Sequence, residues 1–259
     1  MNLINAQIIL TFLYLNVNAL RFALSKQQPL MKLKGQSLIK KPFQKNFNFS
    51  SQNKLDLEIY SEALCPDCQQ FILGSLQKAL NDDIIFDYLN IKIYFYGNAE
   101  EVFDTQANLF SYRCQHGLKE CEGNRISNCI MNKINSIQKA LELIVCLEEE
   151  IKRYAQIQMV NYDKILNKCY QKKKVTNQDL KKILKCNLGE EGNILQHFSA
   201  QKTELQTELQ FVPWILVDGK YDIQQYNSIT KDLILFVCDY YYQNRSVDLP
   251  FCQQKRDSV

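Results

Sequence analysis

Ten cysteines in a chain of 259 residues constrain the fold more than any other feature of this sequence. In an oxidising compartment, thiols at this density persist only when they are paired, and an even number allows every cysteine to have a partner. The chain is long enough for one compact domain, or for one domain that carries a large insertion. We therefore expect a disulfide-stabilised domain that folds in an oxidising environment.

The N-terminus has the pattern of a secretory signal peptide, which we assign to residues 1–19. A short apolar run over residues 8–15 is followed by Val17-Asn18-Ala19, which has the small-x-small pattern of a cleavage site. The run is too short to span a bilayer, and no other stretch is apolar enough to do so, so we expect no membrane anchor. Two N-x-[ST] sequons, at Asn48 and Asn244, permit glycosylation in the secretory pathway.

The segment that follows, residues 20–53, is rich in Lys, Gln, Asn, Ser and Pro and predicts a flexible basic linker or pro-segment. Residues 20–47 hold seven of the 31 basic residues and none of the 28 acidic ones. The other 24 basic and 28 acidic residues leave the rest of the chain with a net charge of about −4. This balance excludes a basic nucleic-acid-binding domain.

Residues 54–252 form the predicted domain, and its first part alternates between strand and helix patterns. Residues 55–60 alternate apolar and polar side chains, residues 66–80 carry apolar side chains at helical spacing, and residues 87–96 alternate again. The connection is long enough for two parallel strands joined by a crossover helix. This pattern predicts an α/β fold.

The later parts of the domain have a different pattern. Residues 101–205 are polar, rich in cysteine and mostly helical, with helices expected over 134–154 and 177–186, so we interpret them as an inserted helical subdomain. Strand character returns at residues 214–217, before the turn signal Asp218-Gly219. A final amphipathic helix is expected over residues 229–242.

The motif Cys65-Pro66-Asp67-Cys68 lies where the first predicted strand ends and a helix begins. Pro66 suits the first helical position, because the N–H that it lacks would have no helical partner there. Free backbone N–H groups and the helix dipole would stabilise a thiolate on Cys65. Cys68, one turn into the helix, is then the resolving thiol of a dithiol–disulfide cycle.

The C-x-x-C pattern alone is compatible with two other arrangements. Its cysteines could each belong to a structural disulfide, or together form half of a zinc site. The strand–helix context favours the redox pair. Asp67 acts in the opposite sense, because a carboxylate beside Cys65 is expected to raise the pKa of that thiol.

A second segment, 148 residues after Cys65, supports a redox site. Phe211-Val212-Pro213-Trp214 places a proline immediately before a predicted strand, where a cis X-Pro bond is a deliberate device. In thioredoxin-like sites such a proline packs against the redox cysteines and leaves the preceding backbone free to pair with substrate. We therefore predict that Val212 and Pro213 line a substrate groove and that Trp214 packs in the core.

The segment from Cys114 to Cys129 reads CQHGLKECEGNRISNC and matches the signature CQHGxxECxxNxxxxC at every defined position. By this signature the chain resembles the gamma-interferon-inducible lysosomal thiol reductase family, over residues 55–252. Cys65 and Cys68 correspond to the redox motif of that family, with Pro-Asp between them in place of the Gly-Ala of the best-known vertebrate form. Val212-Pro213-Trp214 corresponds to its VPW segment. We assign a structural role to the signature, His116 included, and no role to His197.

The resemblance implies a thioredoxin-like fold with a cysteine-rich helical insertion. It also implies a thiol–disulfide oxidoreductase that reduces disulfides in partly unfolded proteins of the endolysosomal or secretory pathway. Cysteine or glutathione would supply the electrons, without a bound cofactor or metal. The remaining eight cysteines are expected to form four structural disulfides, and Cys238–Cys252 is the one pairing that we predict; the other six candidates are Cys114, Cys121, Cys129, Cys146, Cys169 and Cys186.

Two other functions stay open at this point. A secretory-pathway oxidase or isomerase would use the same two cysteines at a higher reduction potential. A non-catalytic, disulfide-stabilised binding module would require Cys65 or Cys68 to be paired with a distant cysteine. A secretory signal is compatible with a lysosomal, an endosomal or an extracellular protein, and the sequence leaves the oligomeric state open.

Overall fold

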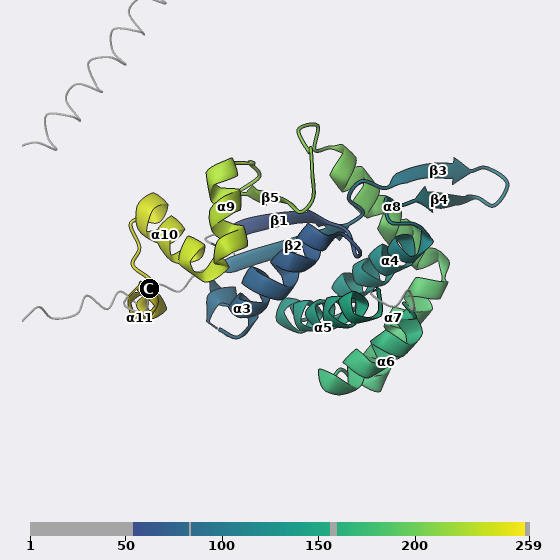
Figure 1. Ribbon diagram of the computed structural model, residues 1–259, viewed down its shortest axis with the longest axis horizontal. Helices are drawn as coiled ribbons and strands as arrows, with labels where there is room; N and C mark the ends of the chain where they lie inside the picture. Colours follow the sequence, from purple (N-terminus) through teal and green to yellow (C-terminus); the bar gives the residue numbers. More distant parts are fainter. Residues whose placement is uncertain (1–53, 83, 156–159, 257–259) are drawn as a thin grey trace, which may run out of the picture. The chain divides into compact units, whose positions relative to one another are not determined.

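The computed structural model describes residues 54–82, 84–155 and 160–256 (Figure 1). The predicted signal peptide, the linker and Asn48 lie outside the described residues. Within the described part of the chain, none of the helices is both long enough and apolar enough to cross a membrane.

A three-stranded sheet forms the centre of the domain. It consists of β1 (Leu55–Ser61), β2 (Leu89–Phe95) and β5 (Trp214–Val217), in the order β2-β1-β5. β1 pairs parallel with β2 and antiparallel with β5. Three alternate side chains of the central strand, Leu55, Leu57 and Ile59, are fully buried, which explains the period-two pattern of its sequence.

The crossover from β1 to β2 is helical, as the sequence predicts. It is a continuous run made of α2 (Pro66–Phe71), a π-helical segment (Ile72–Leu76) and α3 (Gln77–Leu80), followed by a short 3-10 turn (Ile85–Asp87). A helix after the first strand, a parallel second strand and an antiparallel strand on the other edge form an α/β, thioredoxin-like arrangement. This confirms the fold class predicted above.

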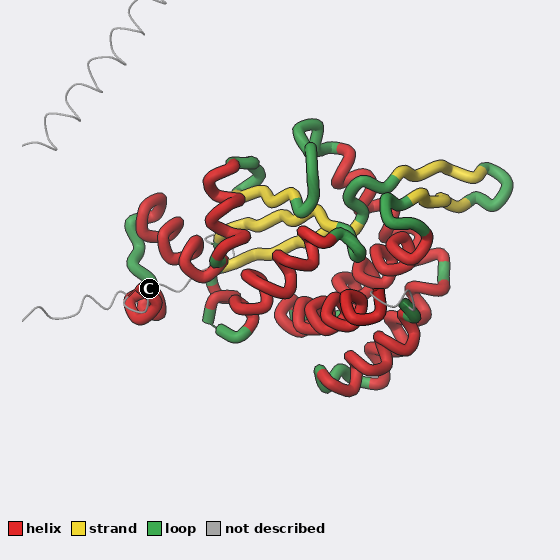
Figure 2. Tube along the Cα trace, viewed as in Figure 1, coloured by secondary structure: helices red, strands yellow, loops and turns green. Residues whose placement is uncertain are grey.

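The described residues between β2 and β5 form a hairpin and five helices. The hairpin of β3 (Glu100–Asp104) and β4 (Leu109–Arg113) projects from the helices in Figure 2. The sequence predicted a mostly helical segment here and did not reveal the hairpin, because both hairpin strands are largely exposed and lack a clean apolar face. The helices are α4 (Leu118–Lys133), α5 (Ile137–Ala155), α6 (Tyr162–Lys172), α7 (Asn177–Leu188) and α8 (Glu190–Glu204).

The end of the chain is also divided differently from the prediction. The single helix expected over residues 229–242 is wrong: α9 (Ile223–Lys231) and α10 (Leu233–Arg245) meet at Asp232, and α11 (Pro250–Arg256) follows. Asp232 has an extended backbone, and its carboxylate accepts hydrogen bonds from the first N–H groups of α10. The Ser75 hydroxyl completes the junction, because it donates to the carbonyl of Ile229 and accepts from the N–H of Leu233.

Four disulfides hold the helices together. Cys129–Cys186 joins α4 to α7, Cys146–Cys169 joins α5 to α6, and Cys114–Cys121 closes the start of α4. Cys238–Cys252 joins α10 to α11, the pairing predicted from the sequence. The longest loop, of 57 residues, is closed by Cys129–Cys186. In a chain-entropy model such a loop stabilises the folded state by about 4 kcal/mol.

One buried side chain fastens α4 to the sheet. The Asn128 amide accepts a hydrogen bond from the N–H of Phe95 at 3.1 Å and donates one to the carbonyl of the same residue at 2.8 Å. The Ser199 hydroxyl of α8 also donates to the Asn128 carbonyl oxygen, at 3.0 Å. Asn128 therefore pairs the backbone of β2 at the strand end next to the candidate site.

Replacing Asn128 with Ala leaves two buried backbone groups of Phe95 without partners. We expect the free energy of unfolding to fall by about 3 kcal/mol, measured by urea denaturation with the disulfides intact. Asn132→Ala, at an exposed position of the same helix, serves as control and should change it by less than about 0.5 kcal/mol. Equal effects of the two substitutions would contradict this role for Asn128.

Candidate active site

Cys65 and Cys68 are the two cysteines that form no disulfide in the structure. Cys65 is the N-cap of α2, with an extended backbone, and its Sγ accepts a hydrogen bond from the N–H of Cys68 at 3.3 Å. Pro66 occupies the first turn, as its sequence position predicts. The other eight cysteines are consumed by disulfides, which leaves no further thiolate for a zinc site built on this motif.

The two thiols have opposite electrostatic environments. Hydrogen bonds from the Cys68 thiol and from the backbone N–H groups of Cys68 and Asp67 lower the pKa of Cys65 and outweigh the effect of its burial. Burial, together with the Cys65 sulfur, raises the pKa of Cys68 well above its usual value. Cys65 is 6% exposed and Cys68 is fully buried. The arrangement therefore favours a thiolate on Cys65 and a protonated thiol on Cys68.

The segment before β5 meets the two cysteines, although 147 residues separate Val212 from Cys65. The Val212–Pro213 peptide bond is cis, as predicted. The carbonyl oxygen of Val212 lies 3.6 Å from Cys65 Sγ, and Val212, Cys65 and Cys68 form one buried cluster with Leu209 packed against it. The tertiary structure thus brings together the two segments that the sequence analysis assigned to the site.

The acid that opposes thiolate formation is not the one expected. Asp67 is exposed, and its backbone N–H is among the groups that lower the pKa of Cys65. The negative charge that raises this pKa belongs to Glu62, which is fully buried three residues before Cys65. The structure therefore assigns the opposing charge to Glu62, a residue that the sequence analysis did not single out.

Residues of the CQHGxxECxxN signature hold the segment that leads from β1 to Cys65. Asn124 Oδ1 accepts a hydrogen bond from the N–H of Ala63 at 2.8 Å. Gly123 packs so closely on Ala63 that a Cβ at position 123 would lie 2.7 Å from the Cβ of Ala63. His116 and Glu120 surround the carboxyl group of Glu62. The signature helix α4 is thus a support for the loop that positions Cys65.

Glu148 of α5 is a second buried acid that the sequence analysis missed. Gln69, next to Cys68, donates from its side-chain amide to the carbonyl of Ala63 at 3.2 Å and to Glu148 Oε2 at 3.1 Å. Burial raises the pKa of Glu148 well above its usual value. The available signal was helical spacing, since Glu148 falls in register with buried Leu141, Ile144 and Ile151.

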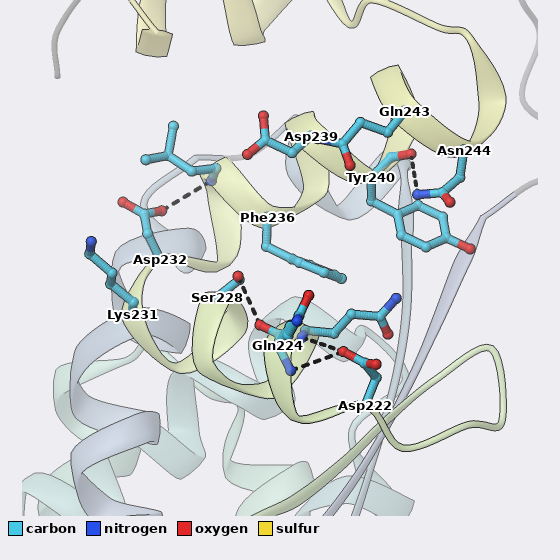
Figure 3. Close-up of a pocket in the computed structure, with 12 residues that line it drawn as sticks. Asp222, Gln224, Ser228, Lys231, Asp232, Phe236, Asp239, Tyr240, Gln243 and Asn244 are labelled. Carbon is cyan, nitrogen blue, oxygen red and sulfur yellow. Dashed lines mark hydrogen bonds between the residues drawn. The ribbon is translucent and has the colours of Figure 1, made fainter.

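A separate surface pocket, with a volume of about 690 Å³, lies between α9 and α10 (Figure 3). Three of its polar side chains form hydrogen bonds with the backbone of α9 or α10. The carboxylate of Asp222 accepts from two N–H groups at the start of α9, Asp232 does the same for α10, and the Ser228 hydroxyl donates to the carbonyl of Gln224. These contacts point to no ligand, and we assign the pocket no chemistry.

Glu148→Gln tests the buried acid. A raised pKa means that folded protein retains a proton that unfolded protein releases, so stability is lost as pH rises above the usual range of a glutamate. We expect the free energy of unfolding to fall less between pH 5 and pH 8 in the variant than in the parent, measured by denaturant titration at each pH.

Glu149→Gln is the matched control. Hydrogen bonds from Lys172 and Gln77 outweigh burial and lower the pKa of Glu149, so its contribution is lost only as pH falls through that lowered value, below the tested range. A pH dependence of unfolding that is identical in the parent and in Glu148→Gln would contradict the assignment of the buried proton to Glu148.

Comparison with known proteins agrees with the geometry. Residues 56–173 match the family model described as "Gamma interferon inducible lysosomal thiol reductase (GILT)". A gamma-interferon-inducible lysosomal thiol reductase of Carassius auratus is 31% identical over 188 residues, covering 71% of this chain and 68% of the relative. The protein of the same name from Mus musculus is 29% identical over 203 residues, covering 78% of this chain and 73% of the relative.

Solved structures give weaker likenesses. The thiol-disulfide oxidoreductase MdbA of Actinomyces oris has a TM-score of 0.47 at 15% identity, covering 68% of this chain and 77% of its own. Reduced DsbA1 of Neisseria meningitidis has a TM-score of 0.44 at 13% identity, covering 85% and 100%. The fold assignment rests instead on the sheet order, the helical crossover and the segment before β5. Because the signature is intact and the chain is 31% identical in sequence to the Carassius auratus protein, it belongs to the gamma-interferon-inducible lysosomal thiol reductase family and is a thiol–disulfide oxidoreductase.

Proposed function

We propose that this chain reduces disulfide bonds in protein substrates, with Cys65 as the nucleophile and Cys68 as the resolving thiol. The observation that carries the proposal is the pair itself: two free thiols at the start of α2, with pKa values displaced in opposite directions. Two free cysteines in this position argue against a non-catalytic binding module.

The reaction follows from the opposite displacements of the pKa values of the two thiols. The Cys65 thiolate attacks one sulfur of a substrate disulfide, that S–S bond breaks, and the departing sulfur leaves with the electron pair and takes up a proton. Cys68 then loses its proton and attacks the sulfur of Cys65, which releases the second substrate thiol and leaves a Cys65–Cys68 disulfide. Two molecules of a small thiol, cysteine or glutathione, reduce that disulfide and are themselves oxidised to one disulfide.

The surroundings of Val212 and Pro213 support binding of extended protein segments. Trp214 stacks on Tyr221, with ring centroids 3.6 Å apart, and Phe211 meets Trp214 and Tyr226 edge to face at 5.3 Å. Phe211, Tyr221 and Tyr226 are partly exposed. Apolar rings beside the Val212 carbonyl suit a partly unfolded chain that offers apolar side chains next to its disulfide.

We further propose that the protein acts in the endolysosomal or secretory pathway. The predicted signal peptide supports entry into this pathway, and Asn244 of the second sequon is exposed near the end of α10. Relatives from Carassius auratus and Mus musculus carry the word lysosomal in their names.

A secretory-pathway oxidase or isomerase is the second candidate, because the lowered pKa of Cys65 stabilises the reduced form of the pair. A stabilised reduced form gives a higher reduction potential. Titration of the Cys65–Cys68 couple against glutathione buffers distinguishes the candidates: we expect a potential low enough for net reduction of substrates, and a potential near that of strong oxidants would favour the oxidase.

Cys65→Ser and Cys68→Ser test the roles of the two thiols. Turnover of a disulfide-bonded protein is followed at pH 5 and pH 7 with cysteine as reductant. We expect Cys65→Ser to lose at least about 99% of the activity. Cys68→Ser should accumulate a mixed disulfide with substrate, seen by non-reducing electrophoresis and mass spectrometry. A Cys65→Ser protein that reduces substrate as fast as the parent would refute the mechanism.

Phe211→Ala tests the aromatic wall of the groove. Loss of the ring should raise KM for an unfolded protein substrate by about three- to tenfold, because an aromatic contact is worth about 1 kcal/mol. Turnover of a small-molecule disulfide by the same variant is the control and should stay near the parental value. Equal losses on both substrates would show a defect in the site rather than in protein binding.

A further inference from the structure

The carboxyl group of Glu62 is held rigidly beside the redox motif. Asn98 donates its backbone N–H to Glu62 Oε1, and Gly97 packs directly on the side chain. A Cβ at position 97 would lie 2.1 Å from Glu62 Cγ, and the backbone φ of Gly97 is +57°. Only glycine satisfies both demands without strain, so the turn after β2 fixes the orientation of the Glu62 carboxyl group.

A second buried carboxyl group faces the first across an imidazole. His116 Nδ1 lies 2.5 Å from Glu120 Oε2 and 3.7 Å from Glu62 Oε2. The side chains of Glu62 and Glu120 are fully buried, while His116 is about one-third exposed. Among the described residues, no lysine or arginine forms an ion pair with either carboxyl group. Glu62 Oε2 is buried without a hydrogen-bond partner.

Two buried carboxylates in this arrangement are costly, because like charges in a low-dielectric site repel and neither is neutralised by a strong cation. Burial, with the nearby charge of Glu120, raises the pKa of Glu62 to about 7, although the Asn98 N–H and His116 act in the opposite sense. The partly exposed imidazole of His116 gives this pair of carboxyl groups a contact with solvent.

We infer, on the basis of the proposed role of Cys65, that Glu62 controls the reactivity of Cys65. Glu62, which lies beside His116 and Glu120, takes a proton from solvent under acidic conditions and releases it toward neutral pH. Its charge therefore opposes the Cys65 thiolate only at the higher pH. Glu62 is a positioning residue, because its charge acts on Cys65 and Cys65 carries out the reaction. The consequence is a nucleophile that keeps more thiolate in an acidic compartment than it would beside a permanently charged acid.

The groups that face this cluster come from four elements. Cys65 and Cys68 lie at the start of α2, and Asn98 contributes its N–H from the turn after β2. His116 and Glu120 come from the turn before α4 and from its first turn. Glu148 of α5 adds an electrostatic interaction with both Glu120 and Cys65. The pKa of Glu62 is about 7, and the charge of Glu62 raises the pKa of Cys65.

The test measures the Cys65 thiol directly. Full-length protein with the Cys65–Cys68 pair reduced is treated with iodoacetamide between pH 4 and pH 9, and the modification of Cys65 is followed by mass spectrometry. The parent should give a profile broader than a one-proton curve, because Glu62 and Cys65 titrate together. Glu62→Gln should give a narrower curve than the parent, with its midpoint lowered by about half a pH unit or more.

Glu120→Gln is an independent test, because it should shift the pH profile of Cys65 alkylation in the direction opposite to that of Glu62→Gln. Without the charge of Glu120, Glu62 ionises at lower pH, so alkylation near pH 6 should be slower than in the parent, whereas Glu62→Gln should stay near the parent at pH 6 and react faster above about pH 7. Glu122→Gln, which removes an acid of the same helix that pairs with Lys119 at the surface, is the matched control and should leave the profile unchanged. Near-UV circular dichroism of each variant verifies folding.

Parental profiles in both folded variants, or a slower reaction in Glu62→Gln, would overturn the inference. If Glu62→Gln does not fold, the result with Glu120→Gln decides. Alkylation does not depend on turnover, so loss of activity in Cys65→Ser together with unchanged profiles would reject the control by Glu62 and leave the proposed function intact. Activity retained in Cys65→Ser would reject the function whatever the profiles show.

Discussion

The short connection between β1 and α2 is held from both sides, and the geometry of the redox pair depends on it. The N–H of Ala63 donates to Asn124 of α4, and the carbonyl of Ala63 accepts from Gln69 of α2. These two bonds hold the backbone two residues before Cys65, whose sulfur must meet the first N–H groups of the helix. The inserted helices therefore contribute to the site mechanically, by supporting a loop that belongs to the sheet.

The same packing sets the electrostatics of the site. The loop that brings Cys65 to the helix N-terminus, where N–H groups favour the thiolate, also buries Glu62 beside it, where a charge would oppose the thiolate. Glu148 and Glu120 add two more acids within the protein interior. Burial keeps Cys68 protonated and raises the pKa of two of these acids, Glu62 and Glu148. Under acidic conditions Glu62 and Glu148 are neutral, and the charge of Glu62 then no longer opposes the thiolate.

Sequence patterns failed where a local signal was weak or ambiguous. The β3–β4 hairpin is largely exposed and its sequence has no clean apolar face, so its residues resemble any polar segment. Apolar residues continue across Asp232, and periodicity alone does not reveal that an aspartate there caps α10 and separates it from α9. Asp67 drew attention because it adjoins Cys65 in sequence, whereas burial makes Glu62 the acid that matters.

The sequence by itself determined the elements whose signals are local: the alternation of β1 and β2, the C-x-x-C motif at the start of a helix, the proline before β5, and a signature long enough to indicate the family. Only the tertiary structure decided how the six cysteines from Cys114 to Cys186 pair, how Val212 meets Cys65 across 147 residues, and which acids surround the thiols. The physical reason is that hydrogen bonding and periodicity within an element depend on neighbours in the chain. Disulfide geometry, burial and the pKa of a carboxyl group depend on neighbours in space, which the packing of α4 against the sheet and of α5 against the helical crossover supplies.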